Sequence, residues 1–133
     1  MTRSELTRDL VILAAAISAG IHGALVPQHF AEGTGAGVGF VAATVVLAAS
    51  AVAVTLRPAS AVALAGAAAV FAGLLVSYAV ATTNGLPVLH PDPEPVDGLA
   101  LVTKAIEAIG LLAASTLIRR PSVAVNLAHP KGT

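Results

Sequence analysis

The sequence predicts an all-α protein that folds as a single four-helix transmembrane bundle. Hydrophobic residues make up 56% of its 133 residues and charged residues only 11%, whereas soluble domains carry roughly 25% charged residues. Four apolar stretches are long enough to cross about 30 Å of hydrocarbon. These stretches are too long for ordinary strands and lack the alternating pattern of a β-barrel strand, so helices are the better interpretation.

The first two predicted spans cover residues 10–26 and 35–56. The first contains no charged residue, holds His22 in its second half, and is expected to end at Pro27, because proline interrupts the helical hydrogen bonds. The second is built almost wholly of Ala, Val, Gly and Leu and ends at Arg57. Each of these two stretches is therefore predicted to cross the membrane once.

The third and fourth predicted spans cover residues 59–81 and 98–118. The third follows the second so closely that the two must form a tight antiparallel hairpin. The fourth begins behind Asp97, a candidate N-cap, and ends at the basic Arg119. Because lipid offers no partner for backbone groups, each span must be helical, and the short connections predict one domain over residues 1–133.

The basic residues predict the orientation, since short cytoplasmic loops are rich in Lys and Arg. By the predicted topology the basic residues outside the spans all fall on one side of the membrane: Arg3, Arg8, Arg57, Arg119, Arg120 and Lys131. The connections 27–34 and 82–97 contain none. We therefore expect a protein of the plasma (inner) membrane with both termini in the cytoplasm and residues 119–133 as a cytoplasmic tail. A cleaved signal peptide is the alternative for the first span, but Glu5 and Asp9 are atypical of its basic start.

Composition excludes several classes of function. The seven basic and seven acidic residues cancel and aromatic residues make up 3%, which argues against a nucleic-acid partner. The absence of Cys excludes disulfides, thiolate metal sites and a cysteine nucleophile.

Small residues are the expected contacts between helices in lipid, because they allow close approach of the backbones. Candidate pairs and stripes occur in three of the spans: Ala16, Gly20 and Ala24; Gly35 and Gly39; Gly110 and Ala114. An alanine-rich sequence also produces such spacings by chance.

Ionisable side chains inside the hydrocarbon are costly, so they normally face the interior of a bundle and have partners. Lys104, Glu107 and Thr103 share one face of the fourth span, and His22 lies at an overlapping depth on the first. We expect the first and fourth helices to touch, with Glu107 partnering Lys104, His22 or both. This buried polar cluster is either a structural clamp or a proton-responsive or metal-binding site.

The connections outside the membrane contribute a second group of candidate residues, which are possible metal ligands. His22, His29, Glu32 and His90 are the residues that could hold a transition metal, since imidazole and carboxylate suit Zn, Cu, Ni or Fe. The alternating prolines of the 82–97 connection favour a stiff, extended lid across the bundle mouth. The spacing matches no diagnostic metal motif, and a solvated connector is the simpler alternative.

Several short runs resemble small four-helix bacterial membrane proteins of uncharacterised function. These runs are Ile21-His22-Gly23, Pro27-Gln28-His29-Phe30-Ala31-Glu32, Thr82-Thr83-Asn84-Gly85-Leu86-Pro87 and Glu94-Pro95-Val96-Asp97, followed by Glu107. The resemblance implies a bundle whose first loop, third loop and fourth helix carry the polar residues, and it implies no activity. The second helix of that pattern often holds a buried amide, which this chain lacks. A fainter similarity to DoxX-like proteins depends on the His near the end of the first helix.

Three functions remain open. The predicted one is a non-catalytic accessory or scaffold subunit of a larger membrane complex, with protein partners or further copies of itself in the bilayer. The alternatives are a protein that handles a transition metal or protons through its outer His and Glu residues, and a small oligomeric transporter. An enzyme is less favoured because no catalytic motif is present.

Overall fold

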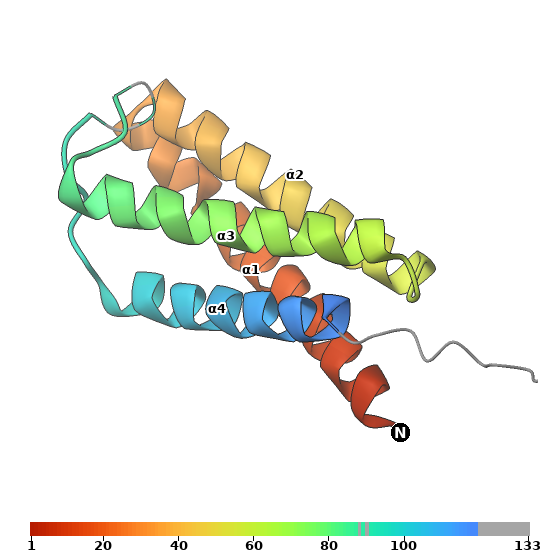
Figure 1. The fold of residues 1–133 in the computed structure, drawn as a ribbon. Coiled ribbons are helices and arrows are strands. Elements are labelled where there is room, and N and C mark those ends of the chain that lie inside the picture. Colours follow the sequence, from red (N-terminus) through yellow and green to blue (C-terminus); the bar gives the residue numbers. More distant parts are fainter. Residues whose placement is uncertain (88, 90, 120–133) are drawn as a thin grey trace, which may run out of the picture.

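The computed structural model describes residues 1–87, 89 and 91–119 and contains four long helices there, joined by two short connections and by the longer connection 84–97. They are α1 (Arg3–Glu32), α2 (Thr34–Leu56), α3 (Ala61–Thr83) and α4 (Gly98–Ile118), and each is long and apolar enough to cross a membrane. The helices run alternately up and down, so the N-terminus and the end of α4 lie at the same end (Figure 1). The predicted fold class, an all-α membrane-spanning bundle, is confirmed.

The first helix is longer than the predicted span, because it continues through Pro27 to Glu32. Proline lacks only its own N–H, and membrane helices tolerate this loss because neighbouring groups compensate for it. The prediction that the helix ends at Pro27 is therefore wrong. The additional turn matters for the site, because it carries His29 and Glu32 on the same helix as His22.

Side-chain caps define the starts of three helices. Thr2 and Glu5 form a reciprocal capping box at α1, Ser60 accepts a hydrogen bond from the Ala63 N–H at α3, and Asp97 accepts one from the Ala100 N–H at α4. The predicted N-cap role of Asp97 is confirmed. These caps satisfy N–H groups that the first helical turn leaves without partners.

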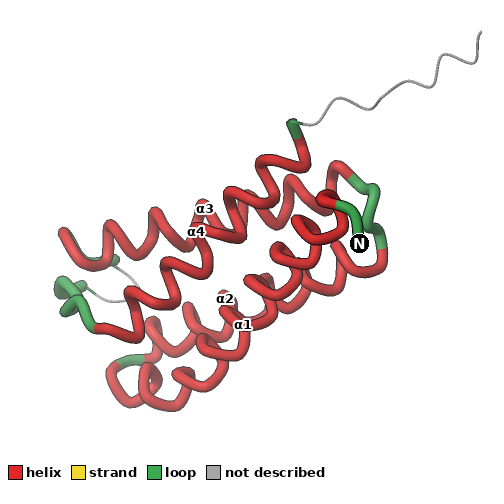
Figure 2. The backbone as a smooth tube through the Cα atoms, turned by 90° about the horizontal axis from the view of Figure 1, so that it is seen from below, coloured by secondary structure: helices red, strands yellow, loops and turns green. Residues whose placement is uncertain are grey.

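The four helices form a ring in which each packs on two neighbours. α1 packs on α2 and α4, and α3 packs on the same two helices from the other side (Figure 2). The largest fully buried side chains of the apolar core include Phe71, Leu47, Val11 and Val54. Large apolar side chains on the outer surface, such as Val62 and Leu112, are exposed, as expected for residues that face lipid.

Three helices approach one another closely at Gly110 in α4. A Cβ atom added there would lie 2.5 Å from the Phe71 ring and 2.9 Å from the Ala14 Cβ atom. Gly110 and Ala114 are both buried, so their predicted role in helix packing is confirmed.

Two other predicted sets of small residues do not form the buried faces of their helices within this chain. Ala16, Gly20 and Ala24 lie on the exposed face of α1, whereas the packed face carries Ala15, Ser18 and Ala19. In α2 the buried residues of the first turn are Ala36 and Gly37, not Gly35 and Gly39. Spacing alone cannot say which of several small faces of an alanine-rich helix meets a neighbour.

Candidate functional site

A buried charge cluster joins α1 to α4 in the middle of the bundle. The Glu107 side chain is fully buried, and its Oε1 atom accepts a hydrogen bond of 2.7 Å from the Ser18 hydroxyl on α1. Its Oε2 atom accepts a second hydrogen bond, also 2.7 Å, from the Lys104 ammonium one turn earlier on α4. Both carboxylate oxygens therefore have charge-assisted or hydroxyl partners, as a buried carboxylate requires. The predicted pairing of Glu107 with Lys104 is present.

His22 and Thr103 complete the predicted cluster but are not bonded to its charges. The His22 Nε2 atom lies 3.9 Å from the Glu107 Oε1 atom, which is beyond hydrogen-bond distance. The Thr103 hydroxyl donates to the Leu99 carbonyl oxygen at 2.8 Å within its own helix. The Ser18 hydroxyl, which the sequence did not single out as a member of the cluster, is the direct link between the two helices.

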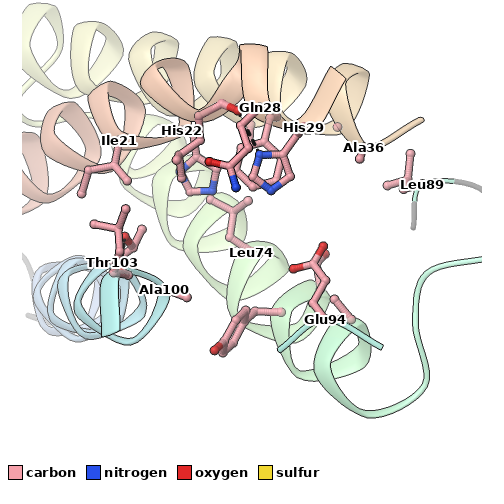
Figure 3. Close-up of a pocket in the computed structure, with 18 of the residues that line it drawn as sticks. Ile21, His22, Gln28, His29, Ala36, Leu74, Leu89, Glu94, Ala100 and Thr103 are labelled. Atoms are coloured by element: carbon pink, nitrogen blue, oxygen red, sulfur yellow. Dashed lines mark hydrogen bonds between the residues drawn. The ribbon is translucent and has the colours of Figure 1, made fainter. Parts of the chain in front are cut away.

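A cavity of about 390 Å³ opens at the end of the bundle that holds the α1–α2 and α3–α4 connections. All four helices and the loop before α4 contribute to its walls. Apolar side chains form much of the lining, among them Leu25, Leu74, Leu86 and Leu89. Figure 3 shows His22, Gln28 and His29 of α1 on one side of this space and Thr103 of α4 on another. Its volume lies within the range of about 300–1,000 Å³ that is typical of small-molecule sites.

Two histidines of α1 line the cavity, and the same backbone interaction orients both. The Nδ1 atoms of His22 and His29 each lie 2.9 Å from a backbone oxygen one turn earlier, those of Ser18 and Leu25. A carbonyl oxygen can only accept, so Nδ1 carries the proton in each ring, and in the neutral imidazole Nε2 is an acceptor. Neither Nε2 atom has a hydrogen-bond partner among the described residues.

Two aromatic residues of the cavity were not predicted from the sequence. The Phe40 ring stacks on His29 with a centroid distance of 3.4 Å. Tyr78 of α3 has the Lys104 ammonium 5.5 Å from its ring centroid, and its buried hydroxyl has no hydrogen-bond partner within the described part of the chain. Tyr78 could have been singled out from the sequence, because it is the only Tyr of the chain.

Carboxylates surround the mouth of the cavity. Glu32 lies 3.8 Å from His29 across one turn of α1, which confirms that these two share a face, and Asp97 caps α4. Glu94 comes from the loop, and its carboxylate points into the same space as the imidazoles (Figure 3). The loop is held there in part by a hydrogen bond from the Glu94 N–H to the Ala81 carbonyl oxygen at 3.0 Å.

The three predicted metal ligands that the structure describes, His22, His29 and Glu32, do not form a coordination site. In the portion of the chain that the structure describes, no three His, Asp or Glu side chains are grouped closely enough to hold a metal ion. His90 lies outside the described residues, as does the predicted tail beyond Arg119. The prediction of a metal site made of His22, His29, Glu32 and His90 thus gains no support from the geometry.

Comparison with known proteins adds no assignment: no family model, curated protein or solved structure matches the chain. The resemblance to small bacterial membrane proteins therefore stays a prediction. The cavity and the charge cluster beneath it are the features of this chain that bear on its function.

Proposed function

We propose that the protein is a membrane-embedded binding protein that holds a small amphipathic organic molecule in the cavity between its four helices. The observation that carries this proposal is the pair of His22 and His29 Nε2 atoms, which line a cavity of about 390 Å³ and have no hydrogen-bond partner among the described residues. A few polar groups that converge on a largely apolar cavity are typical of a small-molecule site.

The charge cluster beneath the cavity favours this binding function. The hydrogen bonds of Ser18 and Lys104 to Glu107 hold α1 against α4 directly under the cavity. Binding sites need walls that keep their spacing when the ligand leaves, and a satisfied polar network between two helices provides such rigidity. In this proposal Ser18 and Glu107, which do not line the cavity, position the site and do not contact the ligand.

The orientation in the membrane is part of the proposal. Arg3, Arg8, Arg57 and Arg119 all belong to the end of the bundle opposite the cavity. The bias of Lys and Arg toward cytoplasmic loops then places the cavity mouth on the outer side of the plasma membrane, with both termini in the cytoplasm.

One pair of matched substitutions tests the binding function. Ala100 of α4 lines the cavity, whereas Ala105 on the same helix is exposed on the outer surface. We expect small molecules that co-purify with the protein from native membranes in mild detergent, identified by mass spectrometry, to be lost in Ala100→Leu and retained in Ala105→Leu. Equal small-molecule content in the wild type and both variants would contradict the proposal. Metal analysis of the same samples tests the alternative of a metal-handling protein.

An accessory subunit is a second candidate, favoured by one observation. Ala16, Gly20 and Ala24 form a stripe of small residues on the exposed face of α1. Small residues at a lipid-facing position permit close packing of a helix from another protein or another copy. If this stripe is an interface, Gly20→Leu should reduce the amount of a co-purifying partner, while Gly66→Leu on the exposed face of α3 should not.

A further inference from the structure

We propose that the ligand of this cavity is a protonated alkylamine, a molecule with a primary or secondary ammonium group and a short apolar chain. This inference depends on the proposed binding function and specifies its ligand. Three properties of the cavity favour this class of ligand: its hydrogen-bonding groups, its charge, and its size and apolar lining.

The two imidazoles on the α1 side of the cavity present hydrogen-bond acceptors to it. The Nδ1 protons of His22 and His29 are used by backbone oxygens, which leaves the Nε2 lone pairs directed at the cavity. His22 and His29 are only 7% and 9% exposed, so a ligand that fills the cavity takes the place of the water that can reach their Nε2 atoms. A ligand that satisfies them must supply N–H or O–H groups, and an ammonium group supplies two or three.

The fixed charges around the cavity select a cation. Glu32, Glu94 and Asp97 contribute three carboxylates to the lining, and Lys104 is the single Lys or Arg among the described residues that line it. The Lys104 charge is already matched by Glu107 at 2.7 Å. Glu94 makes no side-chain hydrogen bond or ion pair within the described part of the chain, so its carboxylate is free to bind a ligand. Clefts lined by one sign of charge concentrate ligands of the opposite sign.

Among the described residues the cavity offers no coordination shell for a bare metal ion, whereas its apolar lining suits an alkyl chain. The described His, Asp and Glu side chains are too dispersed to form a coordination shell, as noted above. An ammonium group needs only two or three of these acceptors at once. Leu25, Leu74, Leu86 and Leu89 leave an apolar volume beside them in which a hydrocarbon chain is buried favourably.

The chain carries its own reporter for this binding. Tyr78 is the single Tyr, Trp is absent, and Tyr78 lines the cavity. The tyrosine fluorescence of the full-length protein in dodecyl maltoside therefore reports on this site alone. We would titrate it at neutral pH with hexylammonium, 1-hexanol and hexanoate, which share a six-carbon chain and differ in charge.

We expect hexylammonium to bind at least about tenfold more tightly than 1-hexanol, because each nearby carboxylate contributes Coulomb energy, and hexanoate to give no saturable response. Glu94→Gln should weaken hexylammonium binding about tenfold and leave 1-hexanol unaffected. Asp9→Asn, the same charge change at the opposite end of α1, should leave both unchanged. His29→Phe keeps a ring against Phe40 but removes the Nε2 acceptor, so it should weaken hexylammonium binding selectively.

Two further outcomes separate this inference from the proposed function. If 1-hexanol or hexanoate binds as tightly as hexylammonium, or Glu94→Gln has no effect, the amine inference is overturned and the binding cavity stands. If none of the three probes gives a response that Ala100→Leu abolishes, the binding function fails as well. Stoichiometric binding of a transition metal that competes with hexylammonium would also overturn the inference.

Discussion

Glu107→Ala is the substitution that tests the physical basis of the bundle most directly. Glu107 is fully buried and accepts two hydrogen bonds of 2.7 Å, from Ser18 and Lys104. Removing the carboxylate leaves a buried ammonium group, on a side chain that is 15% exposed, without its counter-charge. Breaking a buried ion pair from one side costs about 3–5 kcal/mol, and we expect the free energy of unfolding to fall by this amount.

The assay is unfolding by sodium dodecyl sulfate in mixed micelles, followed by far-UV circular dichroism. A double-mutant cycle of Glu107→Gln, Lys104→Met and the combined variant isolates the pair interaction. We expect each single variant to be strongly destabilised and the double variant to recover about 2 kcal/mol relative to the sum of the single effects, because no charge is then left without a partner.

Additive effects would refute this reasoning. If the combined variant loses as much stability as the two single variants together, the carboxylate and the ammonium do not stabilise each other. If Glu107→Ala leaves both unfolding and ligand binding unchanged, the cluster is neither a clamp between α1 and α4 nor a support for the cavity.

Three other predictions concern packing, capping and orientation. Gly110→Ala should lower the free energy of unfolding by about 1–3 kcal/mol in the same assay, because the added Cβ atom has no space. The control is Gly66→Ala, whose Cβ atom meets nothing within 4 Å, and its free energy of unfolding should change little. Asp97→Ala should cost about 1 kcal/mol through loss of the N-cap of α4, and an unchanged unfolding midpoint would count against the cap. In this cysteine-free chain, Phe30→Cys should react with a membrane-impermeant maleimide added outside intact cells and Arg57→Cys should not, whereas the reverse pattern would invert the proposed orientation.

The sequence was a reliable guide to the helices because membrane insertion depends on properties that are local in the chain. An apolar stretch of about 20 residues must be helical in lipid wherever its neighbours lie. The fourth predicted span, 98–118, agrees with α4 at both ends, since Asp97 and Arg119 bound it chemically. The first span was underestimated, because whether a helix continues beyond a proline depends on the structure around that proline.

The candidate site was only partly predictable. Lys104 and Glu107 stand out in any apolar helix, and their spacing of three residues already places them within reach of each other. The contribution of Ser18 could not be read in the same way, because a serine among alanines is common and its bond to Glu107 spans 89 positions of the sequence. Phe40, Tyr78 and Glu94 come from three further segments, and no pattern along the chain relates them.

The amino-acid order by itself determined that the chain is helical, that it belongs in lipid, and that a few charged residues must be hidden between its helices. Hydrocarbon imposes those requirements on each segment separately. Only the tertiary structure decided which faces meet. It turned Ala15 and Ser18 inward and Ala16 and Gly20 outward, and it placed His22, His29 and Glu94 around one cavity. Helix pairing depends on the fit of whole surfaces, and that fit is a property of the assembled bundle and not of any one helix.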